Sequence, residues 1–133
     1  MFRLTAVSLL AAAALVPTAA QAKTIHATSI LSKDGRIFCY ASRPAAGKVV
    51  NCNSPALGHG KGTVRYAQLR PTGATQIVVR NLYDGDNSRP KTIRPGDRWV
   101  WKGIVCTYGS MGLNCNNKSN HGFLLDEVSI TRH

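Results

Sequence analysis

Residues 106–125 read C-T-Y-G-S-M-G-L-N-C-N-N-K-S-N-H-G-F-L-L, and the expected fold is built around them. The two cysteines of this stretch would close a short loop, and two glycines lie inside the loop, where a hairpin has to turn. An asparagine-rich turn and the tripeptide H-G-F at 121–123 follow, and an apolar, strand-like run then begins. The stretch therefore predicts β-structure held by a disulfide.

A smaller version of this arrangement lies upstream. Residues 34–39 read D-G-R-I-F-C, and Cys52 follows after a loop of alanine, glycine and proline. Short strand-like segments separated by turn residues fill the rest of the chain, and no stretch after residue 22 keeps a helical period for three turns. The predicted strands are 23–30, 36–41, 49–52, 63–69, 75–82, 98–106 and 123–131. This pattern predicts an all-β fold, a small disulfide-stapled antiparallel sandwich or barrel.

Residues 1–22 have the three parts of a secretory signal peptide. A positive start, M-F-R, precedes an apolar run of 13 residues (4–16), and A-Q-A at 20–22 is a small-residue cleavage site. The run is shorter than the roughly 18 to 20 residues that span a bilayer, which disfavours the alternative of an uncleaved anchor. We expect residues 23–133 to form one periplasmic or secreted domain.

Four cysteines follow the predicted cleavage site: Cys39, Cys52, Cys106 and Cys115. An even number of cysteines in an exported chain predicts two disulfides, and four cysteines allow three connectivities. Cys39–Cys52 with Cys106–Cys115 is favoured, because each bond closes a short loop rich in turn residues. The alternative is a zinc site, but the gaps of 12 and 8 residues differ from the close pairs of zinc ligands, so no metal is predicted.

The chain is strongly basic, with 17 Lys and Arg residues against 6 Asp and Glu residues. Without Arg3, the mature chain carries a net charge of +10 when its histidines are neutral. Such a balance favours acidic partners and leaves the fold open.

Two segments resemble signatures of a known family. Residues 32–39, S-K-D-G-R-I-F-C, resemble an S-P-S-G-N-I-x-C signature, and residues 112–123 resemble a G-x-x-C-x-N…H-G-F signature. Both signatures are similar to those of a family of small exported bacterial domains of unknown function. The chain departs from the first at K-D for P-S and at Arg36 for Asn. The resemblance implies an exported, disulfide-bonded β-domain and no catalytic residue.

Candidate catalytic and ligand-binding residues are few. His121 is most simply a turn histidine, because no partner for a triad or a metal site lies near it in sequence. Residues 58–62, G-H-G-K-G, are similar to a phosphate-binding loop, but a strand-like segment follows where a helix is needed. Asp84 and Asp86 lack the spaced ligands of a calcium loop and the apolar pocket of a glycosidase pair. We therefore predict no enzyme and no cofactor.

The densest basic tract runs from Arg80 to Lys102. Its cations are interleaved with Tyr83, Trp99 and Trp101; arginine forks can bind phosphate, sulfate or carboxylate, and aromatic faces can stack on sugars or bases. The alternative is that both tryptophans, which share one face of a strand, belong to the core and the charges to a solvated surface. The predicted anion-binding residues are Arg80, Arg89, Lys91, Arg94, Arg98 and Lys102.

Together these features predict an exported, non-enzymatic module that binds an acidic partner. Candidates for the partner are an acidic glycan, a lipid headgroup in peripheral contact with a membrane, or an acidic protein, with no sequence-specific nucleic acid. The alternative is a secreted inhibitor of a lysozyme-like or proteolytic enzyme, which would present the stapled loop Thr107–Asn114 as a rigid element. A small hydrolase would need a pocket that the sequence does not indicate.

Overall fold

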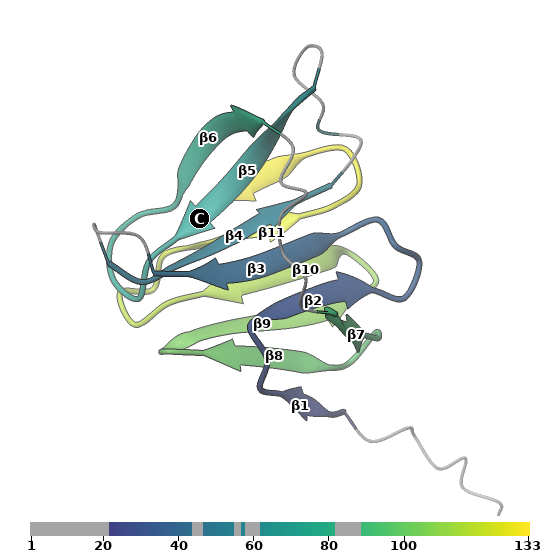
Figure 1. Ribbon diagram of the computed structural model, residues 1–133. Coiled ribbons are helices and arrows are strands. Elements are labelled where there is room, and N and C mark those ends of the chain that lie inside the picture. Colours follow the sequence, from purple (N-terminus) through teal and green to yellow (C-terminus); the bar gives the residue numbers. More distant parts are fainter. Residues whose placement is uncertain (1–21, 44–46, 55–56, 58–61, 82–88) are drawn as a thin grey trace, which may run out of the picture.

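The computed structural model describes residues 22–43, 47–54, 57, 62–81 and 89–133, and these form twelve strands and no α-helix (Figure 1). Sheet A holds, in spatial order, β1 (Thr24–Ile25), β8 (Arg98–Trp101), β9 (Ile104–Gly109), β10 (Gly112–Asn116), β11 (Gly122–Leu125) and β12 (Ile130–Arg132). Sheet B holds β6 (Gln76–Asn81), β5 (Thr63–Leu69), β4 (Val49–Asn53), β3 (Phe38–Ser42), β2 (Ser29–Ser32) and β7 (Lys91–Ile93). The predicted all-β, disulfide-stapled fold is confirmed, as two sheets.

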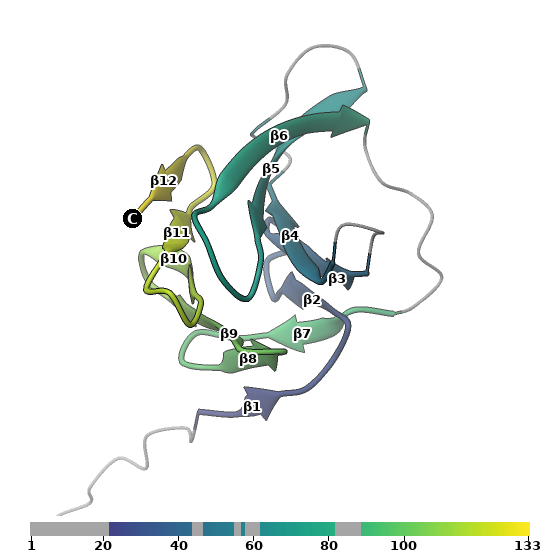
Figure 2. The same ribbon diagram turned by 90° about the vertical axis from the view of Figure 1, so that its left-hand side faces the viewer.

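The chain changes sheets twice, and both crossings lie in the part of the molecule that holds β1, β2, β7 and β8 (Figure 2). It passes from β1 in sheet A to β2 in sheet B, and it returns from β7 in sheet B to β8 in sheet A. These crossings create two short parallel pairs, β1 with β8 and β2 with β7, whereas the other eight strand pairs are antiparallel. The prediction of an antiparallel arrangement therefore holds for all but these two edge pairs.

Each sheet buries one disulfide at the centre of its inner face. Cys106 lies directly opposite Cys115 on β9 and β10, and Cys39 lies directly opposite Cys52 on β3 and β4. The Cα atoms are 4.0 Å apart in the first pair and 4.1 Å apart in the second, and all four cysteines are fully buried. The favoured connectivity is confirmed, and two disulfides are compatible with an oxidising compartment.

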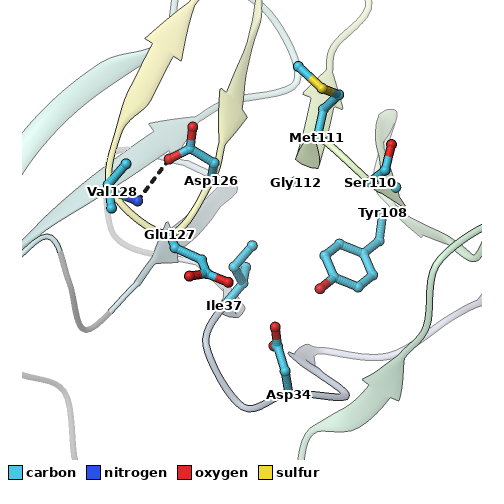
Figure 3. A pocket seen from close by; sticks show the side chains of 10 residues that line it. Asp34, Ile37, Tyr108, Ser110, Met111, Gly112, Asp126, Glu127 and Val128 are labelled. Atoms are coloured by element: carbon cyan, nitrogen blue, oxygen red, sulfur yellow. Dashed lines mark hydrogen bonds between the residues drawn. The ribbon is translucent and has the colours of Figure 1, made fainter.

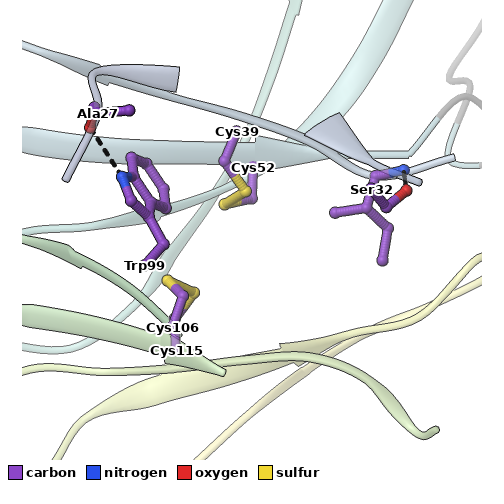
Figure 4. Close-up of a disulfide and its surroundings, with 8 residues drawn as sticks. Ala27, Ser32, Cys39, Cys52, Trp99, Cys106 and Cys115 are labelled. Atoms are coloured by element: carbon purple, nitrogen blue, oxygen red, sulfur yellow. Dashed lines mark hydrogen bonds between the residues drawn. A yellow bond between two sulfur atoms is a disulfide. The ribbon is translucent and has the colours of Figure 1, made fainter. Parts of the chain in front are cut away.

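The two disulfides belong to one hydrophobic core (Figure 4). In sheet A, Trp99 and Phe123 flank Cys106–Cys115 in the same cross-strand row, and in sheet B, Ile30 and Ala67 flank Cys39–Cys52. Because side chains alternate between the faces of a strand, each row presents its apolar groups to the other sheet. Trp99 is 1% exposed, and its indole nitrogen donates to the carbonyl oxygen of Ala27 at 2.8 Å. Trp101 packs partly buried against the same core, so the two tryptophans share a face as predicted.

Three predicted strands are each divided by a turn. The segment 98–106 breaks at Lys102-Gly103, where both residues have positive φ, 47° and 86°. The segment 123–131 breaks after Leu125, because the Asp126 carboxylate accepts hydrogen bonds from the backbone nitrogens of Val128 and Ser129. The segment 23–30 breaks between β1 and β2, where the chain changes sheets. Long-range strand pairing, and side-chain capping at Asp126, override the β-branched or apolar pattern of these segments.

Several predictions concern residues outside the described ranges: the signal segment up to residue 21, most of the loop at 58–62, and Asp84 with Asp86. Within the described ranges, no helix has the length and apolar character needed to cross a bilayer.

We predict that Cys106→Ala combined with Cys115→Val lowers the free energy of unfolding by about 3 kcal/mol, because the bond no longer restricts the unfolded chain. Denaturant unfolding of the oxidised protein and the variant measures the difference. The matched control is the same double replacement at Cys39 and Cys52, which should cost a similar amount. Peptide mapping without reductant that showed a Cys39–Cys115 link, or four free thiols, would contradict the pairing on which this expectation rests.

Candidate functional site

Strand direction places the connections of the two sheets at two opposite ends of the molecule (Figure 1). At one end lie the connections β1–β2, β3–β4, β5–β6, β8–β9 and β10–β11. At the other end lie the connections β2–β3, β7–β8, β9–β10 and β11–β12. Backbone hydrogen bonds join loops within each end, such as Lys118 nitrogen to Pro71 oxygen at the first end and Gly96 nitrogen to Tyr108 oxygen at the second.

Charge is divided unequally between these ends. All four acidic residues in the described part of the chain lie at the second end, in β2–β3, β7–β8 and β11–β12; they are Asp34, Asp97, Asp126 and Glu127. The first end has no acidic residue in any of its connections, as the sequence itself shows. We call the first end the basic end, because its connections carry the exposed or half-buried cations Arg43, Lys48, Arg70, Lys102 and Lys118. The other end, where these acids stand beside cations, is the mixed end.

Asn117 fixes the relative position of two loops of the basic end. Its side chain is buried, and its amide nitrogen donates to the carbonyl oxygens of Arg70 and Gly73 at 2.9 and 2.7 Å. Its side-chain oxygen accepts hydrogen bonds from the backbone nitrogens of Ser119 and His121. The β5–β6 and β10–β11 loops are therefore joined through one buried amide whose donors and acceptor are all used.

The β8–β9 turn brings two lysines together. Lys102 and Gly103 form a two-residue hairpin loop with positive φ at both positions, the backbone of a type I′ turn. A Cβ added to Gly103 would collide with the aliphatic part of the Lys118 side chain, so glycine leaves room for that lysine. Lysine at the first turn position costs on the order of 1 kcal/mol, because an L-residue is strained there.

The structure separates the predicted anion-binding residues. Arg80 lies on β6, at the opposite edge of sheet B from Lys91 on β7. Arg94 and Arg98 lie by the mixed end, in the β7–β8 connection and at the start of β8, and Lys102 lies in the β8–β9 turn of the basic end. All six side chains, including Arg89, are exposed.

Four cations of the basic end lie outside the predicted tract: Arg43, Lys48, Arg70 and Lys118. They come from three loops that are far apart in the sequence, so a search for a dense run of charge misses them. In an antiparallel sheet every second hairpin connection lies at the same end. With the strand order known, this rule would have placed the four cations at one end of the molecule.

A cavity of about 300 Å³ opens at the mixed end (Figure 3). Three of the four described acids line it together with the Tyr108 ring, and Met111 and Val128 are 72% and 73% exposed at its edge. The acids already have intramolecular partners: Asp34 accepts from Ser32 and from the Arg36 backbone, Glu127 forms an ion pair with the Arg36 side chain, and Asp126 caps its own turn.

These contacts shift the ionisation of the cavity residues. The Ser32 hydroxyl and the backbone nitrogen of Arg36 lower the pKa of Asp34, and the backbone nitrogen of Val128 together with Ser129 lowers the pKa of Asp126. Burial, and then the charge of Asp34, raises the pKa of Tyr108. These pKa shifts favour the ionised form of the Asp34 and Asp126 carboxylates and the protonated form of the Tyr108 phenol at neutral pH.

His121 and Gly122 belong to the turn between β10 and β11 and the start of β11. The backbone nitrogen of Asn117 donates to the carbonyl oxygen of His121 at 2.9 Å, and the imidazole of His121 is exposed. The next residue is glycine, and only glycine fits there, because a Cβ added to Gly122 would collide with the carbonyl oxygen of Cys115. Among the residues that the structure describes, no group of three or more His, Cys, Asp or Glu side chains could hold a metal ion.

Comparison with known proteins gives no relative of this chain: no protein-family model, no curated protein and no solved structure matches it.

Proposed function

We propose that this protein is an exported, non-enzymatic binding module whose basic end holds an acidic partner. The observation that carries the proposal is the segregation of charge: five cations on four connections of one end, in loops that contain no acid. In the described part of the chain, these five cations have no carboxylate within 4.0 Å, whereas Arg36 at the mixed end has Glu127. Their charge is thus available to a ligand.

The scaffold of the basic end supports this function. Asn117 joins two of its loops, and the Cys106–Cys115 disulfide lies just before the β10–β11 loop. A surface whose loops are already ordered loses less entropy when a ligand binds. Arginine contributes a planar fork suited to carboxylate, sulfate or phosphate, and lysine contributes a compact point charge. Acidic glycans, anionic lipid headgroups and acidic protein surfaces all present such groups.

The test removes four cations from the basic end and, as a control, four cations from outside it. Replacing Arg43, Lys48, Arg70 and Lys118 with Gln should lower heparin affinity at low salt by about tenfold or more, because four contacts of a few tenths of a kcal/mol each are lost. The matched control replaces Lys33, Arg80, Arg94 and Arg98, four exposed cations outside the basic end, and should lose much less. Salt-gradient elution and titration at several ionic strengths measure both sets.

Three outcomes are informative for the location of binding. Equal losses in the two sets would mean that only net charge matters, and the basic end would have no special role. A larger loss in the control set would place the binding site outside the basic end and would overturn the proposal. No retention of the unmodified protein even at low salt would remove the proposal.

The inhibitor alternative gains support from the mixed end. The tip of the β9–β10 hairpin lies within the stapled loop Thr107–Asn114 and carries Met111, a large apolar side chain that is 72% exposed. The Cys106–Cys115 bond holds the base of this hairpin, and Asp34 with Glu127 lines the adjacent cavity. An apolar anchor beside carboxylates suits a basic enzyme such as lysozyme, despite the positive net charge of the whole chain.

Met111→Asp should abolish inhibition in this alternative, because a charged side chain cannot fill an apolar pocket of the enzyme. The control is Ser110→Asp, which adds the same charge at the neighbouring exposed turn position. Assays of lysozyme and of serine and cysteine proteases with each variant decide the question. If the unmodified protein inhibits none of these enzymes at micromolar concentration, the alternative is rejected.

A further inference from the structure

A second cavity, of about 350 Å³, lies at the basic end. It is formed between the β1–β2 connection and the end of β8, and its lining residues are His26, Ala27, Thr28, Val100, Trp101 and Lys102. The lining thus combines an aromatic ring, an imidazole and a lysine. Unlike the cavity of the mixed end, it contains no acidic side chain.

The cavity exists because β1 is very short. β1 pairs with β8 only at Thr24–Arg98 and Ile25–Trp99, and the chain then leaves sheet A to begin β2. The edge of β8 beyond Trp99 consequently has no neighbouring strand in sheet A. The buried indole of Trp99 holds the carbonyl oxygen of Ala27, which fixes the β1–β2 connection as the opposite wall (Figure 4).

Trp101 and Lys102 are the residues of this cavity suited to a ligand. Trp101 packs partly buried against the core, and it also lines the cavity. Lys102 has a φ of 47° in a turn where Asn, Asp or Gly would be unstrained. A strained lysine next to a cavity indicates that its charge is used there. Lys118 is outside the lining, but its side chain lies over Gly103, next to Lys102, and so places a second cation close to the cavity.

We propose that this cavity binds one anionic sugar unit of an acidic glycan, such as a uronic acid or a sulfated sugar. The proposal rests on the proposed function and names the ligand class. An aromatic ring accepts the apolar face of a sugar, while lysines bind its carboxylate or sulfate. A lipid headgroup or an acidic peptide offers the anion without the ring face, so it would engage Lys102 and Lys118 but gain little from Trp101.

Tryptophan fluorescence tests the proposal directly, because the chain has only two tryptophans and Trp99 is 1% exposed. The unmodified protein is titrated with a heparin-derived tetrasaccharide, an oligogalacturonate, a neutral cellotetraose and vesicles of phosphatidylglycerol. We expect the two acidic oligosaccharides to change the emission and the other two ligands to leave it unchanged.

Two variants locate the ligand. Trp101→Ala should remove the fluorescence change and lower the affinity for acidic oligosaccharides by about tenfold, measured by calorimetry. Lys102→Asn should lower that affinity by at least threefold while the Tm stays the same or rises, because the strain at this position is relieved. If Lys102→Asn lowers the Tm as well as the affinity, the affinity is lost because the fold is destabilised, and the role of Lys102 in binding is overturned.

The proposal and the proposed function fail differently. If the variant without Arg43, Lys48, Arg70 and Lys118 loses heparin binding but Trp101→Ala binds like the unmodified protein, the basic end binds anions without a sugar site and this inference is wrong. The inference is equally wrong if vesicles change the Trp101 emission as strongly as the oligosaccharides do. If the basic-end variant binds as well as the unmodified protein, the proposed function itself fails.

Asp97 carries a second inference, independent of the first. This carboxylate is 5% exposed, and its oxygens accept hydrogen bonds from the backbone nitrogens of Lys23 and Arg94, both at 3.0 Å. The carbonyl oxygen of Lys23 in turn accepts a hydrogen bond from the backbone nitrogen of Arg98 at 2.8 Å. A buried carboxylate therefore holds the nitrogen of the first residue that would follow the predicted cleavage site.

We infer that Asp97 is the receptor for the amino terminus created by cleavage after Ala22. Hydrolysis consumes one water, leaves a carboxylate on Ala22 and frees the nitrogen of Lys23 as an amine, which is mostly protonated at pH 7. The hydrogen bond that the neutral amide nitrogen of Lys23 donates to Asp97 becomes a charge-assisted hydrogen bond from the amine, and such a bond is shorter and stronger. Cleavage would thus turn the hydrogen bond between the Lys23 nitrogen and Asp97 into an ion pair, and this ion pair would stabilise the mature chain.

The experiment compares mature protein that begins with a free Lys23 amine with the same protein acetylated at that nitrogen, since acetylation keeps the N–H and removes the charge. The free amine should raise the Tm by about 5 °C at pH 6. In Asp97→Asn the two forms should have equal Tm values, because the ion pair is absent from both. If the acetylated and free forms of the unmodified protein unfold at the same temperature, the inference is overturned.

Discussion

Two cross-strand disulfides, buried face to face with the Trp99 ring between the sheets, are the constraint on which this structure depends. A chain with about 110 residues after its predicted leader buries only a modest core, so covalent links contribute much of its stability. Each bond joins directly opposed residues and therefore fixes the register of its strand pair. Once both registers are set, the apolar rows of the two sheets must face each other, and the polar loops are left at the two ends.

The position of the loops has an electrostatic consequence. Acids at the mixed end accept hydrogen bonds from their own turns or pair with Arg36, so they are used to build the fold. The basic end is built differently, through the neutral amide of Asn117; in the described part of the chain its cations form no ion pair with a carboxylate, and Arg70 donates a hydrogen bond to the side chain of Gln76 at 3.5 Å. Charge that is not paired within the protein can be used by a ligand, and this is why we propose that an acidic partner binds at that end.

Trp99 and Trp101 show how one strand serves both the core and the surface. They lie on the same face of β8, yet the first is buried and hydrogen-bonded to Ala27 while the second lines a cavity. The difference arises where β1 ends and leaves the edge of β8 uncovered. Trp99 therefore fits the interpretation of a core tryptophan, and Trp101 fits the interpretation of an aromatic surface beside lysine.

The sequence by itself predicted the β-class, the favoured pairing of the cysteines and the hairpin turn between Cys106 and Cys115, because these follow from local alternation, spacing and backbone freedom. It did not determine the turn at Lys102, where lysine occupies a position suited to Asn or Gly, or the parallel pairs at the crossings between sheets. Only the tertiary structure decided which cations share a surface. Arg70 and Lys118 are far apart along the chain and meet because strand order, a property of long-range pairing, brings their loops to one end.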